Sequence, residues 1–433
     1  MSSAESSRSV SPAARPLSGV RVLELAEGWA GPMTGMWLGD LGAEVIKIEA
    51  IQRYDHARGP LAPPEGLPTY PKKRTARPYD VSAPFVQGNR NKLSVTLDLS
   101  RPTGVALFKR LVALSDVVVT NMVTGVPEKM GIGYNELSRV RSDLIMLLSS
   151  GYGASGPYAR RVTMGGAMDG IAGYMWLRHY PDETPDTNTY STETDVVTGM
   201  NNAMAVLMAI YHRLRTGRGQ WIETADVEAS IHQISGALMD YAMNGRVHAS
   251  VGNGHAFMAP HGCYPCAGED RWIAIAIGAE EQWRALRRLM EEPPWSEEPR
   301  FTTILGRLRC KAELDALIGQ WTSGHDQNNL MRRLQAAGIP AGAVHDAPQH
   351  AADPHWAARG VYQRIPLGDA GEYPIPSSPW RFDGRHLDVY RPPPPFGSHN
   401  AHVLRDLLGL TPEEMDRLRR ERYIGEEPLP GHM

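Results

Sequence analysis

The stretch "GVRVLELAEGWAGPMTGMWLGDLGAEVIKIE" (residues 19–49) decides the fold. Two short apolar runs, residues 19–25 and 43–49, flank a Gly- and Pro-containing loop and a helical stretch that ends at Gly42. A strand, a helix and a second strand of these lengths are typical of a βαβ unit, which joins two parallel strands. These residues therefore predict the start of an α/β domain around a parallel sheet.

The same alternation continues along the chain. A helical stretch carries Pro102 in its first turn, and further apolar strands are expected at residues 92–99, 116–121 and 143–153. Ligands of such sheets bind at the carboxyl ends of the strands. We therefore expect a site at the loops that follow three of the strands, which are residues 26–32, 121–126 and 149–157.

The length of 433 residues suffices for two domains. We predict a disordered, Ser-rich tail over residues 1–15, and a second, smaller domain over 250–355, where the texture changes to short strands and turns. Segment 50–88 is rich in Pro, Arg, Lys and Tyr and has no periodicity. Its basic and aromatic residues would suit an acidic substrate, although a solvated loop is the commoner structure.

Composition argues against several classes of partner. The net charge of -3 disfavours nucleic acid or an anionic membrane as the main partner. No apolar run approaches the ~18 residues of a membrane span, and the first residues lack a secretory signal. The three cysteines indicate a reducing, cytoplasmic location without a disulfide framework. Cys263 and Cys266 form a lone CxxC, which is weak support for zinc, so we predict no metal.

A long apolar helix pattern follows Asp195. The pattern predicts a buried helix, with apolar residues at helical spacing that include Met200, Met204, Leu207, Tyr211 and Leu214. An Asp before such a run is typically an N-cap. The chain lacks GxSxG, P-loop and HExxH motifs, so carboxylates are the reactive groups to consider. The candidates are Asp169, Asp195, Glu223, Asp226 and Glu228.

The loop "EGWAGPMTG" (residues 27–35) joins the first strand to its helix. It carries Gly28, Gly31 and Gly35 but no GxGxxG fingerprint, which disfavours a nicotinamide-dependent dehydrogenase. A Gly-lined loop at a helix N-terminus remains well suited to backbone contact with a ligand.

Taken together, the chain resembles the class III CoA-transferases of CaiB/BaiF type, the family of formyl-CoA transferase and crotonobetainyl-CoA:carnitine CoA-transferase. The blocks that carry the resemblance are residues 16–49, 89–99, 116–134, 149–159, 194–223 and 397–415. The resemblance implies a large Rossmann-like α/β domain built from both chain ends, a smaller α+β domain from the middle, and two chains interlocked as a dimer. On that basis the large domain comprises residues 16–245, and residues 356–433 are a linker and the return to it.

The activity implied by the resemblance is acyl-CoA:carboxylate CoA transfer, with CoA and acyl-CoA as substrates and no metal. The family nucleophile matches Asp195, which would form an acyl anhydride and then an aspartyl-CoA thioester. The family's Gly-rich oxyanion loop matches Gly252 and Gly254 in "GNGHA". Many members carry an acid where this chain has Gly165, and Asp169, four residues on, could supply an auxiliary carboxylate.

The family's CoA contacts can also be transferred to this chain. Lys129 stands where the family often has Arg, which keeps the charge but loses the bidentate fork, and a further family Arg corresponds to Ala50. One phosphate or adenine contact is then lost, or supplied by the basic loop 52–76. The matching positions are Gly28, Trp29, Ala30, Lys92, Asn121, Met122, Val126, Lys129 and Met130.

Three functions stay open at this point. The leading one is CoA transfer to an organic acid, for which the 50–88 segment would suit a bulky or aromatic acceptor. A non-catalytic CoA-binding subunit paired with a paralogue is kept open by Gly165 and Ala50, whereas Asp195 argues against it. A 2-methylacyl-CoA racemase would need a His–Asp pair at Met164 and Gly165, which this chain lacks. The partner is accordingly a second copy or a paralogous subunit.

Overall fold

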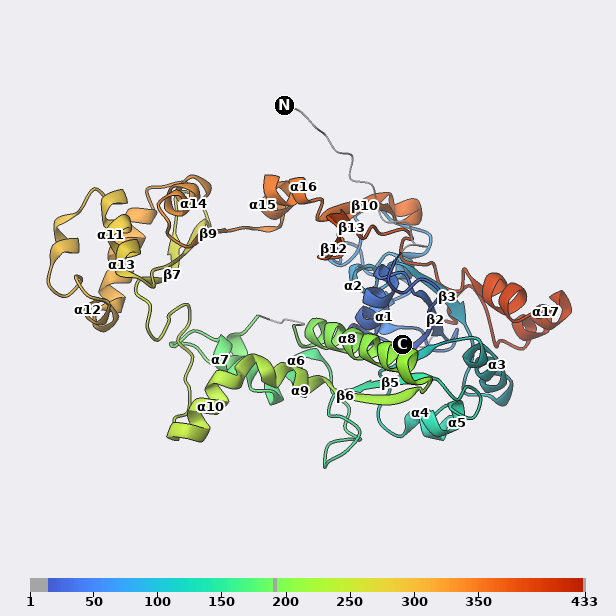
Figure 1. Ribbon diagram of the computed structural model, residues 1–433. Helices are drawn as coiled ribbons and strands as arrows, with labels where there is room; N and C mark the ends of the chain where they lie inside the picture. Colours follow the sequence, from blue (N-terminus) through green and yellow to red (C-terminus); the bar gives the residue numbers. More distant parts are fainter. Residues whose placement is uncertain (1–14, 190–192, 431–433) are drawn as a thin grey trace. The chain divides into compact units, whose positions relative to one another are not determined.

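The structure is a computed structural model that describes residues 15–189 and 193–430 (Figure 1). Residues 1–14 of the predicted tail lie outside the described residues. Arg15, the last residue of that predicted tail, is buried, and its guanidinium donates to the carbonyl oxygens of Asp40 at 2.8 Å and Asp388 at 2.9 Å. Arg15 is therefore part of the folded domain and not of a tail.

The chain divides into two compact units. The first unit contains both ends of the described chain, and the second comes from the middle. The first comprises Met1–Tyr174, Thr189–Met243 and Gly360–Met433, and the second Met175–Asn188 and Asn244–Arg359. The sequence analysis did not assign residues 175–188 to the second unit, because that stretch shows no periodicity.

A six-stranded parallel sheet forms the centre of the first unit, in the order β3-β2-β1-β4-β5-β6. The five strands other than β6 are buried almost throughout, as strands covered by helices on both faces should be. This confirms the predicted parallel α/β architecture. The strands are β1 (Arg21–Leu25), β2 (Glu44–Glu49), β3 (Lys92–Thr96), β4 (Val117–Thr120), β5 (Ile145–Ser150) and β6 (Gln220–Ala225).

The strand order reverses between β1 and β4. Leu23 of β1 pairs with Ile46 of β2 on one side and with Val118 of β4 on the other. Chain connections leave these two central strands in opposite directions, so the loops after β1 and β4 border an opening at the carboxyl edge of the sheet. This arrangement is the switch point at which open α/β sheets bind their ligands.

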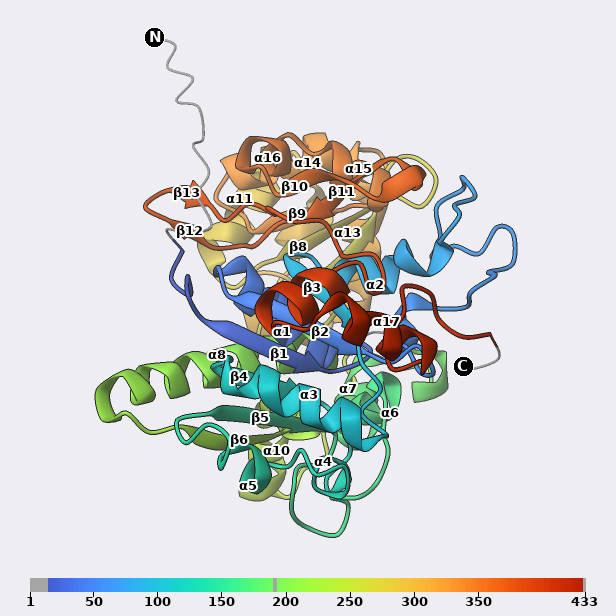
Figure 2. The ribbon, with the colours of Figure 1, turned by 90° about the vertical axis from the view of Figure 1, so that its right-hand side faces the viewer.

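Helices cover both faces of this sheet. One face packs on α1 (Ala30–Asp40) and α8 (Glu193–Thr216). The other face packs on α3 (Pro102–Ala113), the π-helical segment η8 (Ala401–Leu407) and α17 (Pro412–Arg420), and Figure 2 shows α3 and α17 in front of the sheet. The C-terminal segment therefore completes the core begun by the N-terminal strands.

Shorter elements connect these layers. The helical ones are η2 (His56–Arg58), η3 (Pro78–Asp80), α2 (Ala83–Gly88), α4 (Val126–Lys129), α5 (Tyr134–Leu137), α6 (Gly165–Ile171), α9 (Asp226–Ile231), η5 (His232–Ile234) and α10 (Ser235–Asn244). The short helices α7 (Tyr174–Arg178) and η4 (Pro185–Thr187) belong to the second unit, apart from Tyr174. Two antiparallel hairpins are β10 (Tyr362–Pro366) with β11 (Glu372–Pro376), and β12 (Arg381–Phe382) with β13 (Arg385–His386).

The second unit holds an antiparallel sheet in the order β7-β8-β9, packed on helices around Trp283, Phe301 and Ile318. Cys263 and Cys266 are free thiols, and within the described ranges no three His, Cys, Asp or Glu side chains gather as a metal ion would require. The elements of residues 244–359 in the second unit are β7 (His261–Pro265), β8 (Trp272–Ala276), α11 (Glu280–Leu289), η6 (Pro294–Glu297), α12 (Ile304–Arg309), α13 (Lys311–Thr322), α14 (Gln327–Ala336), β9 (Ala341–Val344), α15 (Ala347–Ala352) and α16 (Pro354–Arg359). The short helix η7 (Gly368–Ala370) belongs to the first unit.

Segment 50–88 is anchored by a buried arginine. The Arg58 guanidinium is fully buried, donates to Glu49 at 2.8 Å and to Asp80 at 2.7 Å, and lies 3.7 Å from the centre of the Phe85 ring. Burying this charge is tolerated because two carboxylates pair with it. The expectation of a solvated loop is therefore wrong for the ends of the segment, although residues 64–66 and 72–74 are exposed.

The outer face of α8 corrects a second expectation. The pattern predicted a buried helix, yet Met204 is 58% exposed, Tyr211 60% and Leu214 78%. Apolar periodicity identifies the apolar face of a helix, but it does not show whether the same chain buries that face. No helix in the described part of the chain, α8 included, has the length and apolarity that crossing a membrane requires.

Candidate active site

Two loops at the switch point are joined by Asn121. Its side-chain amide donates to the carbonyl oxygen of Glu27 at 2.7 Å and accepts from the Glu27 N–H at 3.0 Å. Both ends of the amide are thus used to fix the loop after β1 against the loop after β4. Asn121 therefore positions the neighbouring backbone, and its predicted contact with CoA stays a prediction.

Asp55 holds the same loop from the other side. Gly28 adopts φ +76°, a conformation that favours glycine, and its N–H donates to Asp55 Oδ1 at 2.8 Å. Asp55 is fully buried and paired with Lys47 at 2.8 Å, and Lys47 also donates to the Ala26 carbonyl at 2.7 Å. The loop therefore has a preformed shape before any ligand binds.

Lys92, predicted as a CoA contact, is fully buried beneath the loop. Its ammonium donates to Glu24 at 3.0 Å, to the Pro32 carbonyl at 2.7 Å and to Asn89 at 2.9 Å. Burial lowers the pKa of Lys92 to about 8, Glu24 opposes that shift, and the neighbouring charge of Lys47 adds to it. In this arrangement the Lys92 ammonium supports the start of α1, and its contact with CoA stays a prediction.

Asp195 lies where two helices begin. It belongs to the first turn of α8, so it does not precede the helix as an N-cap would, and its Oδ1 accepts a 3.3 Å hydrogen bond from the N–H of Ala30, the first residue of α1. Both helix dipoles present their positive ends to this carboxylate. Gly28, Trp29 and Ala30, predicted to contact CoA, therefore form the segment that leads directly to Asp195.

Burial is the main cause of the unusual acidity of Asp195. It raises the pKa of Asp195 to about 6, the Ala30 N–H and the charge of His56 oppose the rise, and Asp169 contributes to it. At pH 7 the group is then mostly ionised and more basic than an ordinary aspartate. A carboxylate with those two properties can act as a nucleophile.

Asp169, the predicted auxiliary carboxylate, is buried on α6. It accepts a hydrogen bond from the Thr194 hydroxyl, which in turn accepts from Ser230 at 2.7 Å. Because Thr194 precedes Asp195 directly, this chain of bonds fixes the first turn of α8. The structure therefore places Asp169 within electrostatic range of Asp195.

A further carboxylate, Asp226, lies at the end of β6. It is buried, accepts from the Ser149 hydroxyl at 2.7 Å, and its pKa is raised to about 6, first by burial and further by Asp195. Asn202 of α8 donates to the same Ser149 oxygen at 2.9 Å and accepts from Thr224 at 2.7 Å. The sequence included Asp226 among the candidates, and its place directly after a strand was the signal that could have singled it out.

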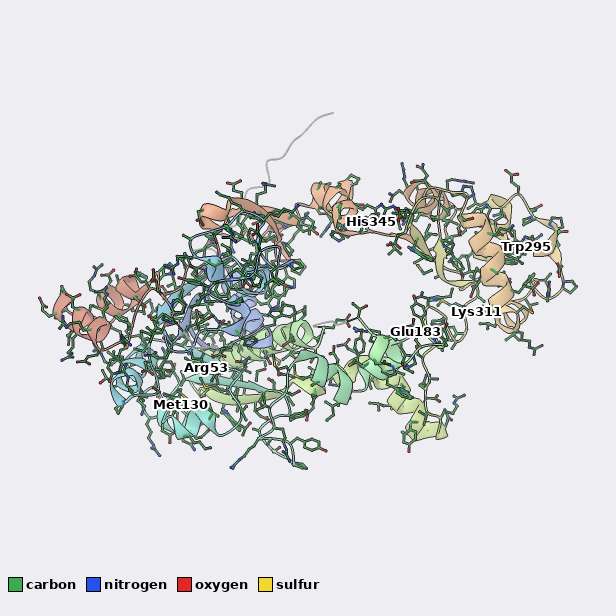
Figure 3. The ribbon with its side chains drawn as sticks, turned by 180° about the vertical axis from the view of Figure 1, so that it is seen from behind. Arg53, Met130, Glu183, Trp295, Lys311 and His345 are labelled. Carbon is green, nitrogen blue, oxygen red and sulfur yellow. The ribbon has the colours of Figure 1, made fainter. Side chains whose placement is uncertain are left out.

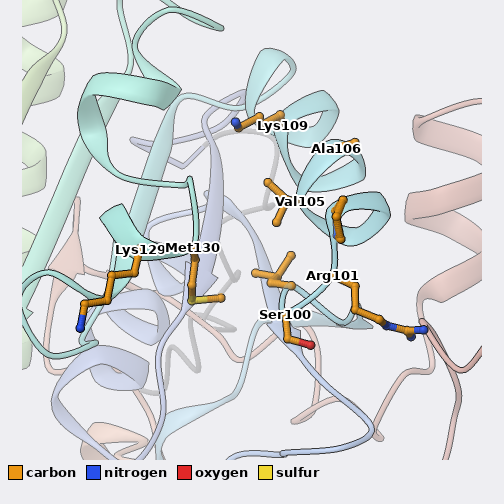
Figure 4. Close-up of a pocket in the computed structure, with 9 residues that line it drawn as sticks. Ser100, Arg101, Val105, Ala106, Lys109, Lys129 and Met130 are labelled. Atoms are coloured by element: carbon orange, nitrogen blue, oxygen red, sulfur yellow. The ribbon is translucent and has the colours of Figure 1, made fainter.

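The remaining predicted CoA contacts follow β4. Met122 and Val126 are half-buried, and Lys129 and Met130 line an open cavity of about 620 Å³. Figure 4 shows Lys109 of α3 and Met130 on two of its walls. The residues that line it are Leu99, Ser100, Arg101, Pro102, Val105, Ala106, Lys109, Lys129 and Met130.

Gly252 and Gly254 lie in the second unit, between α10 and β7. Gly252 adopts φ +55°, and a Cβ there would lie 3.0 Å from the Tyr180 ring. The neighbouring Asn253 amide donates to the Tyr180 hydroxyl at 3.1 Å. The loop is thus shaped by its own unit, and its role toward an oxyanion stays a prediction.

Comparison with known proteins identifies this arrangement. The model of CoA-transferase family III matches residues 17–400. The chain belongs to this family. It is 33% identical to the succinyl-CoA–D-citramalate CoA-transferase of Chloroflexus aurantiacus, over 95% of this chain and 98% of that protein. The alpha subunit of the succinyl-CoA–L-malate CoA-transferase of Chloroflexus aurantiacus is 31% identical, over 94% of this chain and 92% of that subunit.

A solved structure supports the same assignment. The crystal structure of a CaiB/BaiF family protein from Brucella suis superposes with a TM-score of 0.80 at 31% identity, covering 91% of this chain and 99% of that one. The resemblance inferred from the sequence blocks is therefore confirmed, and this family III CoA-transferase is an enzyme of acyl-CoA chemistry.

Proposed function

We propose that this enzyme moves CoA from an acyl-CoA to a free carboxylic acid, with Asp195 as the covalent nucleophile. The observation that carries the proposal is the Asp195 carboxylate at the N-termini of α1 and α8, hydrogen-bonded to Ala30 and with its pKa raised to about 6. Within the family, the chemistry of such a group is acyl transfer in separate covalent steps.

The steps balance without any other reactant. The Asp195 carboxylate attacks the thioester carbonyl, the C–S bond breaks, and CoA leaves as a thiolate from a mixed anhydride. The thiolate then attacks the Asp195 carbonyl, releasing the donor acid and leaving an aspartyl-CoA thioester. The acceptor carboxylate attacks that thioester to give a second anhydride, from which the thiolate takes the new acyl group. Each tetrahedral intermediate needs N–H donors, for which we propose the loop of Gly252 and Gly254.

Charge and shape support a CoA site along the carboxyl edge of the sheet. Lys109 and Lys129 are two cationic side chains on the cavity that follows β4, and Met130 supplies an apolar wall. Phosphates of a nucleotide suit such lysines as point charges, and an adenine ring suits the apolar wall. We propose that the nucleotide end of CoA binds there and that its thioester reaches Asp195 past the loop of Gly28, Trp29 and Ala30.

The acceptor is proposed to be a dicarboxylic acid. The two Chloroflexus relatives are named for succinyl-CoA together with D-citramalate or L-malate. Succinate, citramalate and malate each carry two carboxylates. A bulky or aromatic acceptor was suggested by segment 50–88, but the aromatic Tyr54, Tyr79 and Phe85 of that segment are buried, the two tyrosines in a cluster with Phe396. They are not presented to a substrate.

The exposed apolar face of α8 supports a partner chain. A single apolar face of this extent on one helix is uncommon on a protein that functions alone. We propose that a second copy covers it, or a paralogous subunit as in the relative named as an alpha subunit. The charge and apolar patterning give no support to nucleic acid or a membrane as partner.

Initial-rate kinetics test the proposed function. The purified chain is assayed with succinyl-CoA as donor and L-malate or glutarate as acceptor, each varied against the other. A covalent aspartyl intermediate predicts parallel double-reciprocal lines, because donor and acceptor react in separate half-reactions. Intersecting lines would contradict it, and turnover that requires an added paralogue carrying its own nucleophile would favour the non-catalytic subunit.

A further inference from the structure

The helical turn η2 lies against the loop that leads to Asp195. The carboxylate of Asp55 accepts from the N–H of Gly28 at 2.8 Å and from the N–H of Ala57 at 2.9 Å, which ties the two segments together. A Cβ built on Gly28 would lie 3.0 Å from two atoms of the His56 ring. The His56 imidazole is therefore held directly over Gly28.

The cations of this region differ in accessibility. Lys47, Lys92 and Arg58 are fully buried, and each is paired with carboxylates. By contrast, the His56 side chain is 55% exposed and that of Arg53 is 80% exposed. An incoming anion can therefore reach His56 and Arg53 but not the three buried cations.

His56 and Arg53 share one carboxylate. Arg53 donates to Glu27 at 3.0 Å, and His56 Nδ1 lies 3.9 Å from the same carboxylate (Figure 3 labels Arg53). Lys47 and Asp55 pair with each other. When His56 is protonated and Asp195 is held as its neutral thioester, the positive charges of His56 and Arg53 face the Glu27 carboxylate alone among these groups, so one further anion would balance them. Glu27, supported by Asp55, raises the pKa of His56 and so favours the imidazolium form.

Of the two, His56 acts on the nucleophile. The pKa of Asp195, which burial raises, is lowered again by the charge of His56. The geometry agrees, because His56 lies over Gly28, and the N–H of Ala30, two residues further along the same loop, donates to Asp195 at 3.3 Å. An acid whose first carboxylate attacks the thioester on Asp195 would bring a second carboxylate into the range of His56.

We propose that His56 binds the second carboxylate of a dicarboxylic acceptor and thereby selects dicarboxylic over monocarboxylic acids. The inference rests on the proposed function of Asp195. Binding uses the imidazolium N–H as a charge-assisted donor, and no covalent step is added. His56 is in this account a specificity-determining residue.

Matched pairs of acids test the assignment. In a mechanism with two half-reactions, kcat/KM for the acceptor does not depend on the donor, so one donor serves all measurements. With succinyl-CoA as that donor, glutarate is compared with pentanoate, and adipate with hexanoate, in the wild type, in His56→Gln and in Arg53→Gln. We expect His56→Gln to lower kcat/KM for the two diacids by about tenfold and to leave the monoacids within about twofold. Arg53→Gln, which removes the same formal charge, should keep the preference.

The pH dependence adds a readout that a structural role would not change. Selection requires the imidazolium, so the wild-type preference for diacids should fall as pH rises through the pKa of His56. His56→Lys, which stays charged to higher pH, should keep the preference where the wild type has lost it. The charged groups that face His56 and set this pKa are Glu27, Arg53, Lys47, Asp55 and Asp195.

The outcomes separate this inference from the proposed function. Equal losses for diacids and monoacids in His56→Gln, no loss, or a wild-type preference for the monoacids would overturn the role of His56. In each of those cases the wild type still transfers CoA through Asp195. Absence of turnover with every acid would overturn the proposed function, and this inference with it.

Discussion

Helices α1 and α8 pack against each other on one face of the sheet, yet their surroundings differ. All eleven residues of α1 are buried within the chain. On α8, Val206, Ala209 and Ile210 are buried, whereas Met204 and Tyr211 are largely exposed. Both helices are apolar over most of their length. The difference shows that α1 is buried by its own chain, whereas the outer face of α8 is not, and we propose that a partner chain covers that face.

The two helices meet most closely at their beginnings, where Asp195 lies. Gly199, one turn after Asp195, allows this approach, because a Cβ there would lie 2.7 Å from the Met33 Cβ and 3.2 Å from the Ala30 carbonyl oxygen. The close contact brings the Ala30 N–H to the Asp195 carboxylate. We therefore assign the inner face of α8 to the proposed chemistry of Asp195 and the outer face to assembly.

The largest effect is expected from changing the group at this junction. Asp195→Asn keeps an oxygen for the Ala30 N–H but cannot form an anhydride or a thioester. We expect kcat to fall by at least about 10³-fold, as when other covalent nucleophiles are removed. Steady-state rates with succinyl-CoA as donor measure this. An unchanged midpoint of thermal unfolding would show that the variant folds. A decrease in kcat of less than tenfold would contradict the assignment of Asp195 as the nucleophile.

The outer face of α8 is tested by adding charge to it. Met204→Asp combined with Tyr211→Asp should weaken association by at least about 100-fold, because two buried carboxylates would lack partners in the interface. Sedimentation over a concentration series measures this. Leu114→Asp, at a 42% exposed leucine outside this face, is the matched control and should not change association. A wild type that stays monomeric at all concentrations would refute the role of this face.

The inner face is tested by filling the space at Gly199. Gly199→Ala should destabilise the fold by about 1–2 kcal/mol, since the clash with Met33 outweighs the higher helix propensity of alanine. Gly236→Ala on α10 is the control, because a Cβ there has nothing within 4 Å, and it should be neutral or stabilising. Denaturant unfolding measures both variants. Equal changes in the free energy of unfolding of Gly199→Ala and Gly236→Ala would contradict a tight contact between α1 and α8.

The smallest effect concerns acidity at the junction. Because the ionised carboxylate is the proposed nucleophile, kcat/KM for the donor should rise with pH through the Asp195 pKa of about 6. Asp169→Asn removes a negative neighbour of Asp195 and should move the rising part of this pH profile to lower pH. His56→Gln removes a positive neighbour and should move it to higher pH. Shifts of the same sign in both variants would contradict the electrostatic description of Asp195.

Much of the fold could be predicted from the sequence, because apolar period and turn residues act locally. The predicted strand 43–49 corresponds to β2 (Glu44–Glu49), and the predicted strand 116–121 to β4 (Val117–Thr120). Asp195 was singled out by resemblance to the family, since its spacing alone favoured an N-cap. The outer face of α8 was wrongly predicted to be buried, because periodicity does not reveal whether the same chain covers an apolar face.

The finer features of the site depend on contacts between distant segments. Lys92 was predicted to bind CoA, but its charge is buried against Glu24, a residue 68 positions away in the chain. The position of His56 over Gly28 depends on Asp55, whose pairing with Lys47 no local pattern indicates. Such contacts depend on how the strands are ordered in the sheet, which local sequence does not encode.

Chemical trapping tests the central claim most directly. The enzyme is incubated with succinyl-CoA, quenched with hydroxylamine and digested, and the peptides are mapped by mass spectrometry, with Asp195→Asn as control. The account predicts a hydroxamate on Asp195 that is absent from the control, because hydroxylamine captures both the anhydride and the thioester. A hydroxamate on another residue, or none while the wild type turns over, would contradict it.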